Sequence, residues 1–379
     1  MWKTKSRSPK SGSSSTVRFS FFLFLFLSFP FFSFFLTFFS SAEAAQSMYV
    51  GDEAQEQRGI LALQRPMRHG QIRDMDEWVE IVDQVEKDLD SFEDHPVLIT
   101  MARFNPRKQT EKLVKEMFER YNVPGLHIAI PSVLSLYSTG RTSGLVVGCG
   151  DGVTHCDPII EGTPLPGAFR VNVAGRECSS MLQHLLRESG STLGVTSAEM
   201  ELVRDLKEKF AFVALDYEKS LKDAYRHPRK FDKTYTLPDG QTLTTGDPLF
   251  RCMEGIFQPS YFGSQSAGIQ HTAFNCMLEA DLDVRRELAS NVLMSGGSTM
   301  ARGFGERFEK EFKAVLDENG MSGLIPFFKI SQPPERVFSV WIGGSILTSL
   351  STFDSVWVTR ESVAEVGLEN STSLFHKQA

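Results

Sequence analysis

From residue 74 onward, amphipathic stretches alternate with short apolar runs, and this alternation narrows the fold class more than any other pattern in the chain. Asp74 is suited to cap a helix whose apolar residues recur at helical spacing. Pro96 then breaks the chain before the apolar run 97–99, which is typical of a strand. A second helix is expected after Pro106 and a second strand over residues 126–130. This order predicts an α/β protein with largely parallel strands and a cleft between two lobes.

Later patterns continue the mixed organisation. Thr196 and Glu199 have the spacing of a capping box, which predicts the start of another helix. A tight turn is expected at 238–240 between two strands. The run 341–345 is interpreted as an apolar, strand-like stretch that meets a helix, where glycine serves packing more often than ligand contact.

Charge and cysteine content exclude several classes of function. Asp plus Glu outnumber Lys plus Arg by 47 to 40, and the net charge of -7 argues against nucleic acid as the main partner. Five cysteines are odd in number and form no C-x-x-C pair, so neither a disulfide framework nor a thiolate zinc site is indicated. The main body of the chain is therefore expected to be a reduced, intracellular protein.

Residues 19–41 differ from the rest, because they use only Phe, Leu, Ser and Pro apart from Thr37. With basic residues before it and Ala42-Glu43-Ala44 after it, this segment has the layout of a secretory signal peptide. A transmembrane helix is a second interpretation, although Pro30 lies at its middle. The third is a translated pyrimidine tract, since codons for these residues can carry pyrimidines at their first two positions. We favour the third, which excludes residues 1–47 from the fold and predicts a mature polypeptide without 19–41.

Two glycine-bearing turns are candidates for ligand binding. The apolar run 144–148 leads into Cys149-Gly150-Asp151-Gly152 and out along 153–155, which predicts a β-hairpin with a glycine-rich tip. Such a tip can present backbone N–H groups to phosphate oxygens, while an ordinary hairpin turn is the alternative. The second turn, 295–300, lies between an apolar stretch and a helix expected to run to about Leu316. It suits either a nucleotide at a helix N-terminus or close helix packing.

Taken together and in order, these motifs resemble actin. The resemblance covers about residues 48 to 360 without a large gap, and its matches extend into actin-specific stretches such as 257–260, which disfavours a sugar-kinase type of enzyme. The collinear stretches are 49–55, 58–61, 129–130, 133–137, 140–142, 150–155, 174–176, 204–209, 257–260, 266–269, 295–297, 333–336 and 339–345.

The resemblance implies the two-lobed fold of the actin, heat-shock and sugar-kinase ATPases, with ATP or ADP and Mg²⁺ or Ca²⁺ in the central cleft. It also implies four subdomains, of which the first is incomplete. Residues 1–47 fall outside the family pattern. The expected subdomain boundaries are 66–138 with 339–379 for the first, 48–65 for a remnant of the second, 139–174 with 265–338 for the third, and 175–264 for the fourth.

The resemblance also assigns candidate site residues. Asp151 would face the metal through water, and His69 matches a histidine that actins often methylate, although an exposed loop histidine is the simpler interpretation. The positions that match cofactor-binding residues of actins are Gly150, Asp151, Gly152, Val153, Gly175, Arg176, Lys207, Glu208, Gly296, Gly297, Ser298 and Met300.

The departures from the family pattern affect the reaction. The first phosphate hairpin of actins, Asp-Asn-Gly-Ser-Gly with a following lysine, is absent, and its loss is expected to leave an unpaired edge in the first sheet. Gly148 stands where the second hairpin normally carries Asp, and Pro131 stands where actins place the glutamine that orients the attacking water. On the adenosine side, Ala301 replaces a tyrosine and Val337 a lysine. Single lost contacts of this kind commonly cost about 10² to 10³ in rate.

The sequence therefore predicts an actin-like structural protein of the cytoskeleton or of an actin-containing complex, cytoplasmic, with weak ATP binding. No efficient enzymatic activity is expected. ATP hydrolysis is expected only if the missing first phosphate hairpin is restored. Its partners would be other actin-family subunits or actin-binding proteins, with a membrane only if residues 19–41 are a genuine translated segment. The alternative is a competent filament ATPase whose first exon is mis-joined. The hypothesis of a secreted or membrane-anchored protein is based on residues 19–45 alone.

Overall fold

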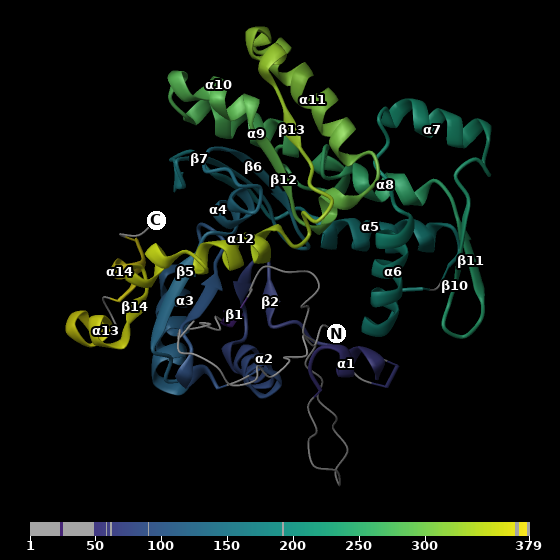
Figure 1. Cartoon of the computed structure of the whole chain (residues 1–379). Coiled ribbons are helices and arrows are strands. Elements are labelled where there is room, and N and C mark those ends of the chain that lie inside the picture. Colours follow the sequence, from purple (N-terminus) through teal and green to yellow (C-terminus); the bar gives the residue numbers. More distant parts are fainter. Residues whose placement is uncertain are drawn as a thin grey trace, which may run out of the picture.

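The computed structural model describes residues 23–25, 49–57, 59–60, 63–89, 91–191, 193–367 and 371–376. These residues form two lobes, each with its own β-sheet and its own hydrophobic core (Figure 1). Trp78, Phe92 and Leu113 belong to the core of the first lobe. Phe257 and Phe308 belong to the larger core of the second lobe. The expected two-lobed α/β architecture is confirmed.

The sheet of the first lobe has the strand order β1-β4-β5-β14. Its strands are β1 (Leu23–Leu25), β4 (Val97–Thr100), β5 (Gly125–Ala129) and β14 (Val358–Thr359). The two strands predicted at 97–99 and 126–130 are confirmed as β4 and β5, which pair in parallel. The expectation of an unpaired edge is wrong, because β1 runs parallel to β4 and continues its hydrogen-bond ladder. The exclusion of residues 1–47 from the fold is also wrong for residues 23–25, which form β1.

The helices of the first lobe begin where the sequence places their caps. Asp74 accepts a hydrogen bond of 3.0 Å from the backbone N–H of Glu77 and so starts α2 (Met75–Asp88). The apolar face of α2 buries Trp78 and Val82 against the sheet. The other elements of this lobe are α1 (Asp52–Glu56), β2 (Met67–Arg68), β3 (Gln71–Ile72), η1 (Phe92–Asp94), α3 (Arg107–Lys115), η2 (Glu116–Arg120), α4 (Pro131–Tyr137), α12 (Ser339–Thr348), η6 (Ser351–Ser355), α13 (Arg360–Val366) and α14 (Thr372–His376).

The sheet of the second lobe mixes parallel and antiparallel strands. Its order is β13 (Ile330–Ser331), β12 (Val292–Ser295), β6 (Gly144–Cys149), β7 (Thr154–Ile160) and β8 (Thr163–Pro164), with β9 (Phe169–Val171) also paired to β7. β13, β12 and β6 are parallel, whereas β7, β8 and β9 are antiparallel to their neighbours. The expectation of largely parallel pairing is corrected here, because the short tip between β6 and β7 permits only a hairpin.

Helices cover this second sheet, and α5, α6, α8 and the β10–β11 hairpin extend to one side of it (Figure 1). Both side-chain bonds of the predicted capping box between Thr196 and Glu199 are present at the start of α6. The predicted tight turn at 238–240 joins β10 to β11. The elements are α5 (Gly175–Glu188), α6 (Ser197–Phe210), α7 (Tyr217–Arg226), β10 (Lys233–Thr236), β11 (Thr242–Thr245), α8 (Pro248–Glu254), η3 (Pro259–Phe262), α9 (Ile269–Glu279), α10 (Leu282–Ser290), η4 (Gly297–Met300), α11 (Phe304–Glu318) and η5 (Ser322–Phe327).

The run 341–345, expected to be strand-like, lies inside helix α12, so this prediction is wrong. The helix packs against α4, and a Cβ at Gly343 would overlap the carbonyl oxygen of Leu134. The glycine therefore permits two helix backbones to approach closely, and tertiary packing decides the conformation of this run.

A ring of three buried serine hydroxyls joins the two lobes. Ser135 lies on α4, Ser295 ends β12 and Ser339 begins α12. Their Oγ atoms are 3.0 Å apart between Ser135 and Ser295, 2.8 Å between Ser295 and Ser339, and 3.1 Å between Ser339 and Ser135. Each hydroxyl can donate one bond and accept another, so the ring satisfies all three groups away from water.

Among the described residues, no helix combines the length and the apolarity needed to cross a bilayer. The secretory and membrane interpretations depend on residues 19–45, which lie outside the described residues apart from β1.

Candidate nucleotide-binding cleft

Two neighbouring cavities lie along the junction of the lobes. The larger has a volume of about 350 Å³ and is lined from the first lobe by residues such as Arg65 and Pro131 and from the second by the tip of the β6–β7 hairpin. The smaller, of about 200 Å³, is lined by α6 and by the turn at η4. Gly150, Asp151 and Val337 line both cavities, so the hairpin tip separates them.

The hairpin tip presents unused backbone donors. Gly150 donates a backbone hydrogen bond of 3.0 Å to the carbonyl of Val153 and closes the turn. The backbone N–H groups of Asp151, Gly152 and Val153 have no acceptor within the described part of the chain. Successive N–H groups in a turn of this kind make a concave site that favours an anion.

Three other elements converge on this tip. The N–H groups of Gly175 and Arg176, which begin α5, donate to the carbonyls of Gly150 at 3.0 Å and Asp151 at 2.6 Å. Ser298 Oγ donates to the same Gly150 carbonyl at 2.7 Å. Lys207 Nζ on α6 donates to the carbonyl of Gly175 at 2.7 Å. Candidate residues from distant parts of the sequence thus meet at one point.

The turn after β12 can approach the hairpin because it carries glycine. Gly296 has φ of 90°, which favours glycine, and a Cβ at this position would collide with the carbonyl oxygen of Cys149. The turn then places Gly297, Ser298 and Met300 along the wall of the smaller cavity.

Asp151 is surrounded by arginine. Its Oδ2 accepts from Arg176 Nη2 at 2.9 Å and Nε at 3.2 Å, and Arg65 Nη1 lies 3.7 Å from the same oxygen. Burial alone would raise the pKa of Asp151, but the positive charges of Arg176, Arg65, Arg204 and Lys207 together outweigh it and leave the pKa below its ordinary value. Arg65 also donates to Glu201 on α6, whose carboxylate lies 3.6 Å from Arg204.

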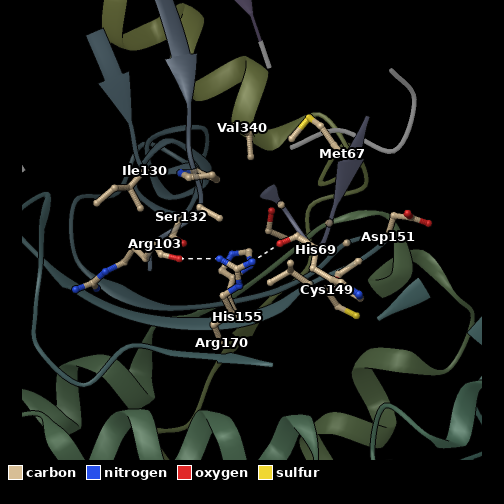
Figure 2. A pocket seen from close by; sticks show the side chains of 18 of the residues that line it. Met67, His69, Arg103, Ile130, Ser132, Cys149, Asp151, His155, Arg170 and Val340 are labelled. Carbon is tan, nitrogen blue, oxygen red and sulfur yellow. Dashed lines mark hydrogen bonds between the residues drawn. The ribbon is translucent and has the colours of Figure 1, made fainter. Parts of the chain in front are cut away.

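A further half-buried cation, Arg170, lies beside the larger cavity. Arg170 donates to the carbonyls of Arg103, at 3.0 Å, and His69 (Figure 2). It also donates to Asn105 Oδ1 at 2.8 Å. Burial lowers the pKa of Arg170, yet an arginine remains charged at any physiological pH. Arg170 therefore brings positive charge to this cavity.

The position opposite His155 in the hairpin is Gly148, and a Cβ there would overlap the imidazole ring. Burial lowers the pKa of His155, although Asp157 Oδ2 at 3.9 Å opposes this effect. The Nε2 atom of His155 has no hydrogen-bond partner among the described residues. Asp157 itself accepts from Ser132 and lies 3.5 Å from Arg103.

The remaining substituted positions also line the cavities. Pro131 is the first residue of α4, where its missing N–H is tolerated, and it is buried in the wall of the larger cavity. Ala301 and Val337 line the smaller cavity.

Most candidate residues lie together. Of those named from the sequence, all except Gly175 line one of the two cavities, and Gly175 is buried immediately beneath the hairpin tip. The interpretation of His69 as an exposed loop residue is corrected, because it is half-buried and its Nδ1 lies 2.7 Å from the carbonyl of Gly152. Sequence reasoning missed Arg65, Arg170 and Glu201, since no local motif contains them and only folding brings them to the cleft.

The described acidic side chains of the cleft are not arranged as a set of metal ligands. Within the described ranges, no group of three or more His, Cys, Asp and Glu side chains is placed to hold a metal ion. Asp151 is the acidic side chain of the hairpin tip, and the guanidinium groups of Arg65 and Arg176 already lie against its carboxylate.

A sequence model of the family described as Actin matches residues 32–373, which is well over half of the chain.

Proposed function

The chain belongs to the actin family, and from this premise we propose that it is an actin-like structural subunit of the cytoskeleton or of an actin-containing complex, whose cleft binds ATP or ADP weakly and hydrolyses ATP poorly. The fold is of the α/β actin type, and members of the family associate with other actin subunits and actin-binding proteins. The subdomain boundaries given above and the cytoplasmic location are part of the proposal.

The observation that carries nucleotide binding is the set of three consecutive N–H groups at residues 151–153, which point to no acceptor within the described structure. Backbone donors held by a rigid hairpin stabilise phosphate oxygens without any side chain. The smaller cavity, next to this tip, is where we place the adenosine, against Lys207, Glu208 and Met300.

Weak affinity for the nucleotide is proposed because the adenosine side of the cleft lacks two side chains that contact the nucleotide in actins. Ala301 leaves the cavity without the aromatic ring that the family carries, and Val337 offers no charged donor. An aromatic ring against a base and a cationic donor commonly contribute about 1 to 3 kcal/mol each.

Actins bind nucleotide together with Mg²⁺ or Ca²⁺, and Asp151 is the side chain expected to face the ion. The residues present do not fit an ion at that carboxylate, because both arginines would stand beside the ion with charge of the same sign. We therefore assign no step of the reaction to a metal at Asp151.

Slow hydrolysis is proposed from two positions. Pro131 can only pack in the cavity wall, so it provides no amide to orient water. The space beside Gly148 holds the His155 ring, and this position lacks the carboxylate of the family. Transfer of a phosphoryl group depends on the positioning of the attacking water and on the stabilisation of charge. The loss of the glutamine at Pro131 weakens the first, and the loss of the carboxylate at Gly148 weakens the second.

The alternative is a competent filament ATPase whose natural start differs from residues 1–47. A different start leaves Pro131 and Gly148 unchanged, so we favour the first proposal.

Calorimetric titration of the full chain with ATP tests the proposal. We expect weak saturable binding that Lys207→Met reduces about tenfold, since this buried lysine lines the cavity and donates to the carbonyl of Gly175, beneath the hairpin tip. Lys209→Met is the matched control, because Lys209 is exposed on the same helix and pairs with Asp205; it should change the affinity less than twofold. Absence of binding, or equal loss in both variants, would contradict the proposal.

A further inference from the structure

The carboxylate of Asp151 occupies the place of an anionic ligand between two arginines. Arg176 binds it through Nε and Nη2, and Arg65 approaches the same oxygen from the other side of the cleft. Arg176 belongs to the start of α5 in the second lobe, whereas Arg65 precedes β2 in the first. A single carboxylate oxygen thus holds guanidinium groups from both lobes.

The surrounding charges leave an excess of positive charge where the two cavities meet. The cations that line the two cavities are Arg65, Arg103, Arg170, Arg176, Arg204 and Lys207, and the carboxylates that line them are those of Asp88, Asp151, Asp157 and Glu208. The hydrogen bonds of the Arg170 guanidinium go to neutral oxygens. Cations at this density suit a polyanion better than they suit a second cation.

We infer that the cleft takes a nucleoside di- or triphosphate as the metal-free anion, with Arg65 and Arg176 supplying the positive charge that a divalent cation would otherwise supply. This inference rests on the proposed function, because it concerns the same cleft. The phosphate oxygens displace the Asp151 carboxylate from the arginines, which are already oriented toward one point. Guanidinium groups present planar donors that match phosphate oxygens and do not need an ion between them.

The inference predicts an unusual sign for one substitution. Asp151→Asn has nearly the same shape as the natural side chain but removes the internal anion that competes for both arginines. Metal-free ATP should therefore bind at least about threefold more tightly to this variant, because ligand and carboxylate no longer compete for the same donors. A metal centre at Asp151 would give the opposite result, since the variant would lose this charged ligand.

The experiment is calorimetric titration of the full chain with ATP, once in EDTA and once in excess Mg²⁺. The natural protein should bind ATP in EDTA at least as tightly as in Mg²⁺. Arg65→Ala should weaken binding in EDTA about tenfold. Arg68→Ala is the matched control, because Arg68 is exposed on β2, lines neither cavity, and carries the same charge three residues away; it should leave the affinity within twofold.

Thermal unfolding of each variant shows whether it is folded, and the sign of the Asp151→Asn effect decides the matter even if Arg65→Ala is unstable. Binding that requires Mg²⁺ and is weakened by Asp151→Asn would overturn the inference and leave nucleotide binding intact. Failure to bind ATP in either buffer would remove both proposals, so the two failures are distinguishable.

Discussion

The imidazole ring of His155 fills the space beside Gly148, its partner on the neighbouring strand of the β6–β7 hairpin. A glycine within a strand commonly marks close approach by another group, and here that group is a side chain from the same hairpin. The missing carboxylate at Gly148 and the position of His155 are therefore linked, and one cannot be changed without the other.

The first prediction follows from this link. Gly148→Asp should lower the free energy of unfolding by about 1 to 3 kcal/mol, because the new Cβ forces the His155 ring out of its packed position. Denaturant unfolding measures this loss. His155→Ala alone is the control for the ring. The double variant should be more stable than the sum of the two single effects predicts, and simple additivity would contradict the overlap.

The second prediction concerns hydrolysis. Adding Pro131→Gln to the Gly148→Asp, His155→Ala protein should raise the single-turnover rate of ATP hydrolysis at least about tenfold, equivalent to roughly 1.4 kcal/mol in the barrier. The glutamine amide can orient water at a position where proline only packs. Pro131→Ala in the same background is the control and should give no gain. A rate equal to that of ordinary filamentous actin in the unmodified protein would refute the argument.

The third prediction concerns affinity. Ala301→Tyr together with Val337→Lys should strengthen ATP binding about tenfold, because both side chains enter the wall of the smaller cavity. Calorimetry or competition with a fluorescent nucleotide measures the gain. Leu282→Lys, at an exposed position on α10, adds the same charge elsewhere and should leave the affinity unchanged. Equal gains from the pair and from this control would indicate a general effect of charge.

The fourth prediction concerns pH. Burial raises the pKa of Cys252 to about 12, whereas an unfolded thiol titrates near about 8.5. Between these values the folded state binds more protons than the unfolded state, so stability present below about pH 8.5 is lost as the pH rises. From pH 8.5 to 10 the natural protein should lose about 2 kcal/mol more than Cys252→Ala, at about 1.4 kcal/mol per pH unit. Denaturant unfolding under reducing conditions measures this, and parallel pH profiles would contradict it.

Local signals in the sequence predicted much of the fold. Asp74 and Thr196 cap their helices as expected, because a cap depends on residues only three positions apart. The prediction for the run 341–345 was wrong for a related reason. Its small residues carry no local helix signal, and its helix depends on packing against α4.

Some residues of the candidate site could likewise be predicted from local signals, and others could not. The hairpin tip and the turn at 295–300 could be found from their glycines, because these reflect backbone geometry within a few residues. Contacts such as that of Arg65 with Glu201, which are 136 positions apart, exist only after both lobes have folded. The packing of the His155 ring beside Gly148 also could not be predicted from the sequence, because a glycine does not indicate which neighbour approaches it.

The ring formed by Ser135, Ser295 and Ser339 has a mechanical consequence for the two lobes. A hydroxyl group can turn about its C–O bond and redirect its hydrogen without moving its oxygen, so a small rotation of one lobe against the other keeps all three bonds. Pulling the lobes apart breaks two of them at once and leaves buried oxygens without partners. The ring therefore acts as a swivel joint, which permits twisting of the lobes and resists their separation.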